Sequence, residues 1–213
     1  MTIDQIISLL EQEYGALERR SHNDPLSELI AAILSQNTSD VNSKRAFDRL
    51  VATFGPWEGV AEASIDQIAE AIKGGGLSRM KAGRIKAILE SIRQDQGNLD
   101  LGFLRSLPLA EAKAWLEKLP GVGPKTAACV LLFSLGRPAL PVDTHVYRVS
   151  RRLGLIDSRA SSKEAHRLLE EAVSPQARYQ FHLHMLAQGR SICKAPRPLC
   201  HTCILEEGCP KII

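Results

Sequence analysis

Apolar residues recur along most of this chain at the spacing that places them on one face of an α-helix. The first strong example of this spacing is formed by Leu26, Leu29, Ile30, Ile33 and Leu34. Asp24 and Pro25 stand just before it, where an N-cap and a first helical residue belong. No sustained alternation of apolar and polar residues is present, so we predict an all-α fold of about ten short helices.

The composition is that of a folded chain with unevenly distributed charge. The 213 residues are 44% hydrophobic, which is enough to bury a sizeable core in one or two domains. Residues 137–213 contain 12 Lys and Arg against 7 Asp and Glu, whereas the rest of the chain is slightly acidic. A basic C-terminal part is compatible with a polyanionic partner and equally with ordinary solvated surface.

The N-terminal residues and the longest apolar run bear on the location of the protein. The chain does not begin with the basic segment and small-residue cleavage site of a secretory signal. Its longest apolar run, residues 127–135, is too short to cross a bilayer. We therefore expect a cytoplasmic protein, nucleoid-associated if bacterial, that does not bind a membrane.

Four cysteines lie close together near the end of the chain, at Cys193, Cys200, Cys203 and Cys209. The segment has few apolar residues and offers four thiolates, which is typical of a loop wrapped around a metal. Structural zinc sites usually present two Cys-x2-Cys pairs, whereas only one is found here, and the wider intervals favour a [4Fe–4S] cluster. Zinc and disulfides remain alternatives, although the expected compartment disfavours disulfides.

A glycine-rich turn joins two predicted helices in the sequence Leu-Pro-Gly-Val-Gly-Pro-Lys-Thr-Ala-Ala, residues 119–128. The backbone N–H groups of Gly121 and Gly123, with those of the next helix's first turn, would point outward and suit a phosphate, and we count Val122 between them with the DNA-binding residues. A DNA strand would supply that phosphate. A plain connection between two helices would give the same pattern.

Two ionisable residues are candidates for catalysis. Lys125 lies in the first turn of the helix after the glycine-rich turn, where the helix dipole and partial burial both disfavour an ammonium. We therefore predict a lowered pKa for Lys125, and a neutral amine is a nucleophile. A phosphate-binding or solvated lysine is the alternative. Asp143 precedes a further helical pattern and suits either an N-cap or an active-site carboxylate.

The hairpin with Lys125, the Val-Asp-Thr-His-Val segment around Asp143 and the four-cysteine tail occur here in one order. That order resembles endonuclease III, a base excision DNA glycosylase of the helix-hairpin-helix family, over most of the chain. The resemblance implies two helical domains with a cleft between them. One would be a six-helix domain of residues 26–136 with the helix-hairpin-helix motif, and the other an iron–sulfur cluster domain of residues 1–25 and 137–213.

The resemblance also implies a reaction. Lys125 matches the family's catalytic lysine, which attacks C1′ of the damaged nucleotide and forms a Schiff base with the opened sugar. Asp143 matches the catalytic aspartate, whose carboxylate stabilises oxocarbenium-like charge and assists proton movement. Relatives that only excise a base carry another residue at the lysine position. The resemblance therefore implies a bifunctional DNA glycosylase and abasic-site lyase that removes oxidised pyrimidines and cleaves the strand by β-elimination.

Two loops resemble those that fill the gap left when the target base is extruded. They are residues 36–40 and 74–78. The family's intercalating glutamine aligns with Asn37, while Gln36 stands one position earlier, so either amide is a candidate. Leu77 matches the apolar wedge. Plain turns between helices are the alternative.

The remaining candidates concern binding rather than chemistry. Lys194 and Arg197 lie between the first two cysteines and would contact phosphates, unless they are ordinary surface charges. We expect a monomer that binds double-stranded DNA containing damaged bases or abasic sites. A mismatch-specific glycosylase of the same fold, a non-catalytic iron–sulfur DNA-binding module and a zinc-stabilised binding protein are the competing functions. The presence of both Lys125 and Asp143 favours an enzyme.

Overall fold

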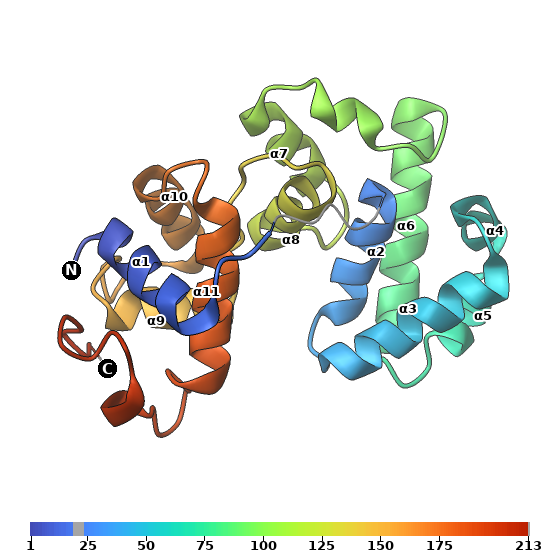
Figure 1. Ribbon diagram of the computed structural model, residues 1–213. Coiled ribbons are helices and arrows are strands. Elements are labelled where there is room, and N and C mark those ends of the chain that lie inside the picture. The colour runs from blue at the N-terminus through green and yellow to red at the C-terminus, as the bar shows by residue number, and fades with distance from the viewer. Residues whose placement is uncertain (19–23, 213) are drawn as a thin grey trace. The chain divides into compact units, whose positions relative to one another are not determined.

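The computed structural model describes residues 1–18 and 24–212, and all the regular structure of these residues is helical (Figure 1). The prediction of an all-α fold is confirmed. The chain divides into two compact units, Met1–Arg20 with Pro138–Ile213, and Ser21–Arg137. We call them the terminal unit and the central unit. The predicted segment 1–25 includes residues 19–23, which lie outside the described part of the chain.

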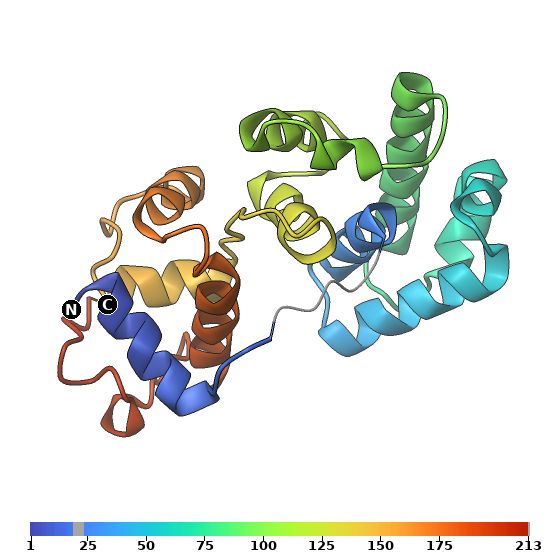
Figure 2. The same cartoon turned by 45° about the horizontal axis from the view of Figure 1, so that its top comes forward.

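The terminal unit combines helices from both ends of the chain. Its elements are α1 (Ile3–Tyr14), α9 (Thr144–Arg152), α10 (Ser162–Ala172), α11 (Arg178–Ser191) and the 3-10 turn η3 (Cys200–Thr202). Helix α11 packs against both α1 and α9, as Figure 2 shows. The four α-helices share one core, which includes Ile6, Leu10, Val146, Leu169, Phe181 and Met185. The N-terminal helix is therefore part of the same unit as the four-cysteine tail.

The central unit is built around its first helix. Its elements are α2 (Pro25–Ser35), α3 (Asp40–Phe54), α4 (Trp57–Glu62), α5 (Ile65–Ala71), α6 (Ser78–Gln96), the 3-10 turn η1 (Gly102–Arg105), α7 (Leu109–Glu117), α8 (Pro124–Cys129) and the π-helical turn η2 (Val130–Ser134). Helix α2 contacts α3, α6, α8 and η2 (Figure 1). The apolar positions predicted to form one face of this helix are all buried. The packing of α2 against α6 fixes the end of α2 and the start of α6, which adjoin the loops described below.

Local sequence signals account for several helix starts. Asp24 Oδ1 accepts hydrogen bonds from the N–H groups of Leu26 and Ser27, at 3.0 and 3.1 Å, and so caps α2 as predicted. Ser64 and Gln67 form a reciprocal capping box at α5. The described residues of the central unit contain seven α-helices, where the resemblance implied six. No helix among residues 1–18 and 24–212 is long and apolar enough to cross a membrane.

Candidate DNA-binding and catalytic site

The predicted hairpin joins α7 to α8 by a tight turn. The N–H of Val122 donates to the carbonyl of Leu119 at 3.1 Å, and Gly121 has a φ of +74°. The positive φ favours glycine at this position, and a β-carbon there would lie 2.8 Å from Cδ of Arg84, so any other residue would also displace that side chain. Gly123 is the N-cap residue of α8 and makes no side-chain capping bond. The first turn of α8 therefore begins without a side-chain cap.

Lys125 is the second residue of α8. Pro124 occupies the first position, as predicted, and the Lys125 side chain is half-buried. The next four residues, from Thr126 to Cys129, are buried. The two features used to predict a lowered pKa for Lys125, a helix start and apolar neighbours, are thus both present, and the shift itself remains a prediction.

Asp143 is the N-cap of α9 in the terminal unit. Its Oδ1 accepts hydrogen bonds from the backbone N–H groups of His145, at 2.9 Å, and Val146, at 2.8 Å. The side chain is half-buried. Because both capping bonds use Oδ1, the cap does not use Oδ2. The structure thus places Lys125 and Asp143 at the starts of two different helices, one in each unit.

The two predicted gap-filling loops lie side by side in the central unit. A β-carbon at Gly76 would lie 3.6 Å from the carbonyl oxygen of Asn37 and 3.8 Å from Cβ of Thr38. Leu77 is 55% exposed, so its side chain is accessible from solvent. Asn37 is also exposed. The structure therefore brings the candidate amide and the candidate wedge to one place.

The two amide candidates have different surroundings. Gln36 is anchored, since its Nε2 donates to the carbonyl of Gly121 at 3.2 Å and its Oε1 accepts from Nη1 of Arg84 at 2.8 Å. Asn37 has an exposed side chain and a left-handed backbone, with φ of +52°. This geometry favours Asn37 as the residue that enters the DNA helix and gives Gln36 a supporting place beside the hairpin.

Left-handed backbone is concentrated in the loops predicted to contact DNA. Among the described residues, four that are not glycine have a positive φ: Asn37, Leu77, Arg197 and Lys211. The first three are predicted DNA contacts. Asparagine tolerates this region, but leucine and arginine rarely adopt it, and such strain is most often found where function requires it.

The four tail cysteines line one pocket of the terminal unit. Burial raises the pKa of the Cys203 and Cys209 thiols, which would lose their protons on binding a metal. Within the described part of the chain, no group of three or more His, Cys, Asp or Glu side chains is close enough together to hold a metal ion. The thiols are therefore gathered around a shared space and do not converge on one point.

Helix α9 supports the start of the cysteine tail, a feature that the sequence reasoning missed. Arg152 donates to the carbonyls of Lys194, at 2.7 Å, and Ala195, at 3.1 Å, and lies 3.4 Å from Sγ of Cys193. Nε of Arg148 donates to the Cys193 carbonyl at 3.0 Å. The available signal was the i, i+4 spacing of these two arginines, which places both on one face of a helix.

A second sulfur receives a hydrogen bond from α11. Nε2 of Gln188 donates to Sγ of Cys203 at 3.0 Å, and the Tyr14 hydroxyl donates to Oε1 of Gln188 at 2.6 Å. Gln188 is buried, so its amide must be paired within the protein. Because the Tyr14 hydroxyl occupies Oε1 of Gln188, the Nε2 end of the Gln188 amide faces the sulfur of Cys203.

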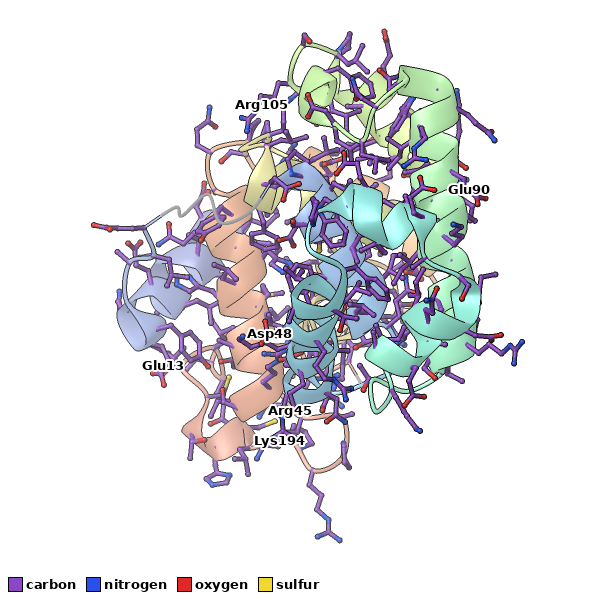
Figure 3. The ribbon with its side chains drawn as sticks, turned by 90° about the vertical axis from the view of Figure 1, so that its right-hand side faces the viewer. Glu13, Arg45, Asp48, Glu90, Arg105 and Lys194 are labelled. Atoms are coloured by element: carbon purple, nitrogen blue, oxygen red, sulfur yellow. The ribbon has the colours of Figure 1, made fainter. Side chains whose placement is uncertain are left out.

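Lys194 and Arg197 are both exposed on the loop between the first two cysteines. Figure 3 labels Lys194 on this loop, after the end of α11. Arg197 has a φ of +54°. Both side chains are thus exposed, and their contact with phosphates stays a prediction.

Comparison with known proteins places these features in a family. The chain belongs to the HhH-GPD superfamily of base excision DNA repair proteins, which its residues 30–175 match. Endonuclease III of Thermotoga maritima is 34% identical over 192 residues, which are 89% of this chain and 85% of that protein. The At3g47830 protein of Arabidopsis thaliana is 37% identical over 180 residues, which are 84% of this chain and 61% of the plant protein.

A solved structure has the same fold. It is described as a trapped endonuclease III–DNA covalent intermediate, is 30% identical to this chain and superposes with a TM-score of 0.84. The match covers 99% of this chain and 97% of that one. The chain therefore has the fold of endonuclease III.

Proposed function

We propose that this protein is a bifunctional DNA glycosylase and abasic-site lyase that removes oxidised pyrimidines from double-stranded DNA. The observation that carries the proposal is a lysine, Lys125, at the start of the helix that follows the glycine hairpin. A glycosylase that only hydrolyses the glycosidic bond needs no amine nucleophile there. The similarity to a solved covalent endonuclease III–DNA intermediate supports the same conclusion.

In the proposed reaction the target nucleotide leaves the base stack, and Asn37 and Leu77 occupy the gap. The neutral amine of Lys125 attacks C1′, the glycosidic bond breaks, and the base leaves with its electron pair and takes up a proton. The sugar ring opens as the amine forms a Schiff base with C1′. Loss of a proton from C2′ then expels the 3′ phosphate by β-elimination, and water hydrolyses the Schiff base to free the lysine.

Asp143 is proposed to act on the same nucleotide. A carboxylate beside C1′ stabilises the positive charge that develops on the sugar and accepts the proton that the lysine loses when it attacks. Asp143 is held for this task by its cap bonds to His145 and Val146, which fix the side chain through Oδ1. Oδ2 would then face the substrate.

We further propose that the four tail cysteines hold a [4Fe–4S] cluster. What supports this is that all four line one pocket and that their spacing is wider than in most zinc sites. When bound, the cluster would cross-link the tail through metal–sulfur bonds. Arg152 and Gln188 would direct N–H groups at the sulfurs of Cys193 and Cys203, a type of contact that orients and tunes metal ligands.

The proposed function is tested by incubating the protein with duplexes that each carry one defined lesion. We expect release of oxidised pyrimidines, accompanied by a strand break whose 3′ end bears the unsaturated sugar of β-elimination. Release of mismatched thymine or adenine without a strand break would instead indicate the mismatch-specific alternative. Binding without release of any base would indicate a non-catalytic module.

Replacing Cys200 by alanine is expected to remove the brown colour and visible absorption of an iron–sulfur centre and to weaken DNA binding. The loop beyond Ala195 should loosen, whereas residues 193–195 keep their bonds to Arg148 and Arg152. Saturating DNA should restore part of the turnover, because Lys125 and Asp143 lie elsewhere. Absorption spectra, thermal melting and binding titrations measure these effects.

The matched control for this experiment is Cys129→Ala, since Cys129 is a buried cysteine of the central unit. That variant should keep both the absorption and the affinity. A folded Cys200→Ala protein that lacks the cluster yet binds DNA as the wild type does would refute a role of the cluster in shaping the loop.

Lys194→Ala and Arg197→Ala should each weaken binding to unrelated duplexes to a similar extent. Loss of one phosphate contact lowers the slope of log K against log salt by about one unit. Lys163→Ala is the control, because Lys163 is an exposed lysine on α10 of the same unit. A slope that is unchanged in both loop variants would show that these side chains do not face DNA.

A further inference from the structure

One lysine of the central unit is fully buried. Lys81 lies in the first turns of α6 with 0% of its surface exposed. Its Nζ donates to the carbonyl of Leu34 at 2.6 Å and to the carbonyl of Gly75 at 2.8 Å. Leu34 comes two residues before Gln36, and Gly75 comes two residues before Leu77. One ammonium group therefore joins the two backbone segments that lead into the gap-filling loops.

A buried ammonium is an unfavourable choice for stability alone. Removing the charge from water has a cost, which lowers the pKa of Lys81 from its ordinary value. An apolar side chain of similar volume would fill the same space without that cost, and such replacements are often neutral or stabilising. An apolar side chain would not supply a hydrogen-bond donor that reaches carbonyls on two separate segments. The hydrogen bonds of Lys81 therefore hold these two segments in position.

Arg84 makes a second connection one turn further along α6. Its Nη1 donates to Oε1 of Gln36 at 2.8 Å, and Gln36 donates in turn to the carbonyl of Gly121 at 3.2 Å. The Arg84 side chain also lies against Gly121, where a β-carbon would come within 2.8 Å of Cδ. The face of α6 that carries Lys81 and Arg84 thus holds both loops and ties one of them to the hairpin that precedes Lys125.

We propose that Lys81 and Arg84 are positioning residues for base extrusion, which hold Asn37 and Leu77 in the geometry needed to enter the DNA helix. This rests on the proposed function. Both loop residues have a left-handed backbone, which the surrounding structure must maintain. They must also keep their position against the stacked bases that they displace. Neither positioning residue touches the reacting atoms in this proposal.

The test compares Lys81→Met with Lys86→Met. Lys86 lies on the same helix and also donates to backbone carbonyls, those of Ala61 and Ala63. These carbonyls lie at the end of α4, and the whole of α5 separates them from the loop of residues 74–78. The two variants therefore remove the same kind of contact from one helix. Thermal melting records the loss of stability in each.

The readout is excision of one lesion in two duplexes under single-turnover conditions. In the first duplex the lesion is well paired, and in the second it lies opposite a mismatched base, which makes extrusion easier. For Lys81→Met we expect excision from the well-paired duplex to slow on the order of tenfold or more, as displaced positioning groups predict. Excision from the mismatched duplex should change much less. Lys86→Met should affect both duplexes equally.

Extrusion is also followed directly, by the fluorescence of 2-aminopurine placed beside the lesion. Lys81→Met should slow the fluorescence rise on binding, and Arg84→Met should do so to a smaller extent.

Arg84 is half-buried, so the Arg84→Met variant decides the question if Lys81→Met does not fold. Equal losses on both duplexes, or variants that match Lys86→Met, would overturn the proposal. A wild-type protein that extrudes bases but excises none would refute the proposed function and leave the fluorescence comparison valid.

Discussion

Replacing Lys125 by glutamine is expected to abolish strand cleavage and covalent trapping of the protein on DNA by borohydride. Glutamine is polar and only one atom shorter than lysine, but it has no amine that can form a Schiff base. Loss of a catalytic nucleophile lowers turnover on the order of 10³-fold or more. Binding to an uncleaved duplex should change only slightly, because the hairpin backbone and the loop cations remain. Gel assays of cleavage and trapping, with parallel binding titrations, measure these effects.

The control for this prediction is Lys118→Gln. Lys118 is an exposed lysine at the end of α7, on the other side of the same hairpin, so the substitution removes the same charge nearby. It should retain cleavage and trapping. A Lys125→Gln protein that is trapped with undiminished yield would show that another amine is the nucleophile.

Replacing Asp143 by asparagine should slow base excision by about 10²–10³-fold, the usual effect of removing one group that stabilises transition-state charge. The fold should be retained because asparagine is as good an N-cap as aspartate. The amide oxygen can accept the bonds from His145 and Val146 that Oδ1 now accepts. Single-turnover excision and thermal melting separate the two roles of this residue.

Asp24→Asn is the matched control for this substitution. Asp24 caps α2 with the same geometry, through Oδ1 and two backbone N–H groups. Both variants should have melting temperatures close to that of the wild type, and only Asp143→Asn should lose activity. An active Asp143→Asn protein would reduce Asp143 to a helix cap.

The helices and their starts were predictable because they depend on residues close together in the sequence. Asp24 and Pro25 open α2, and Ser64 and Gln67 open α5, through bonds that span three residues or fewer. The end of α8 was not predictable in this way. The apolar run after Pro124 continues to Leu135, but the α-helix gives way at Val130 to a π-helical turn, which apolar periodicity does not reveal.

The candidate site was only partly predictable, since its supports come from distant parts of the chain. The sequence alone does not decide whether Gln36 or Asn37 enters the DNA. The contacts that separate them, from Arg84 and Gly121, are 48 and 85 residues away from Gln36. The sequence does contain a signal for Lys81, because it is a charged residue in register with the buried Ile85 and Ile88 on one face of α6. The identity of its two carbonyl partners, Leu34 and Gly75, can be known only from the folded structure.

The central claim, that Lys125 is the amine that attacks C1′, is tested most directly by locating the covalent bond. Wild-type protein is incubated with a duplex that carries an oxidised pyrimidine, reduced with borohydride, digested with protease and nuclease, and analysed by mass spectrometry. We predict that the sugar remnant is attached to the peptide containing Lys125, through its Nζ. Attachment at any other lysine or at the N-terminal amine, or the absence of an adduct while bases are released, would contradict the claim.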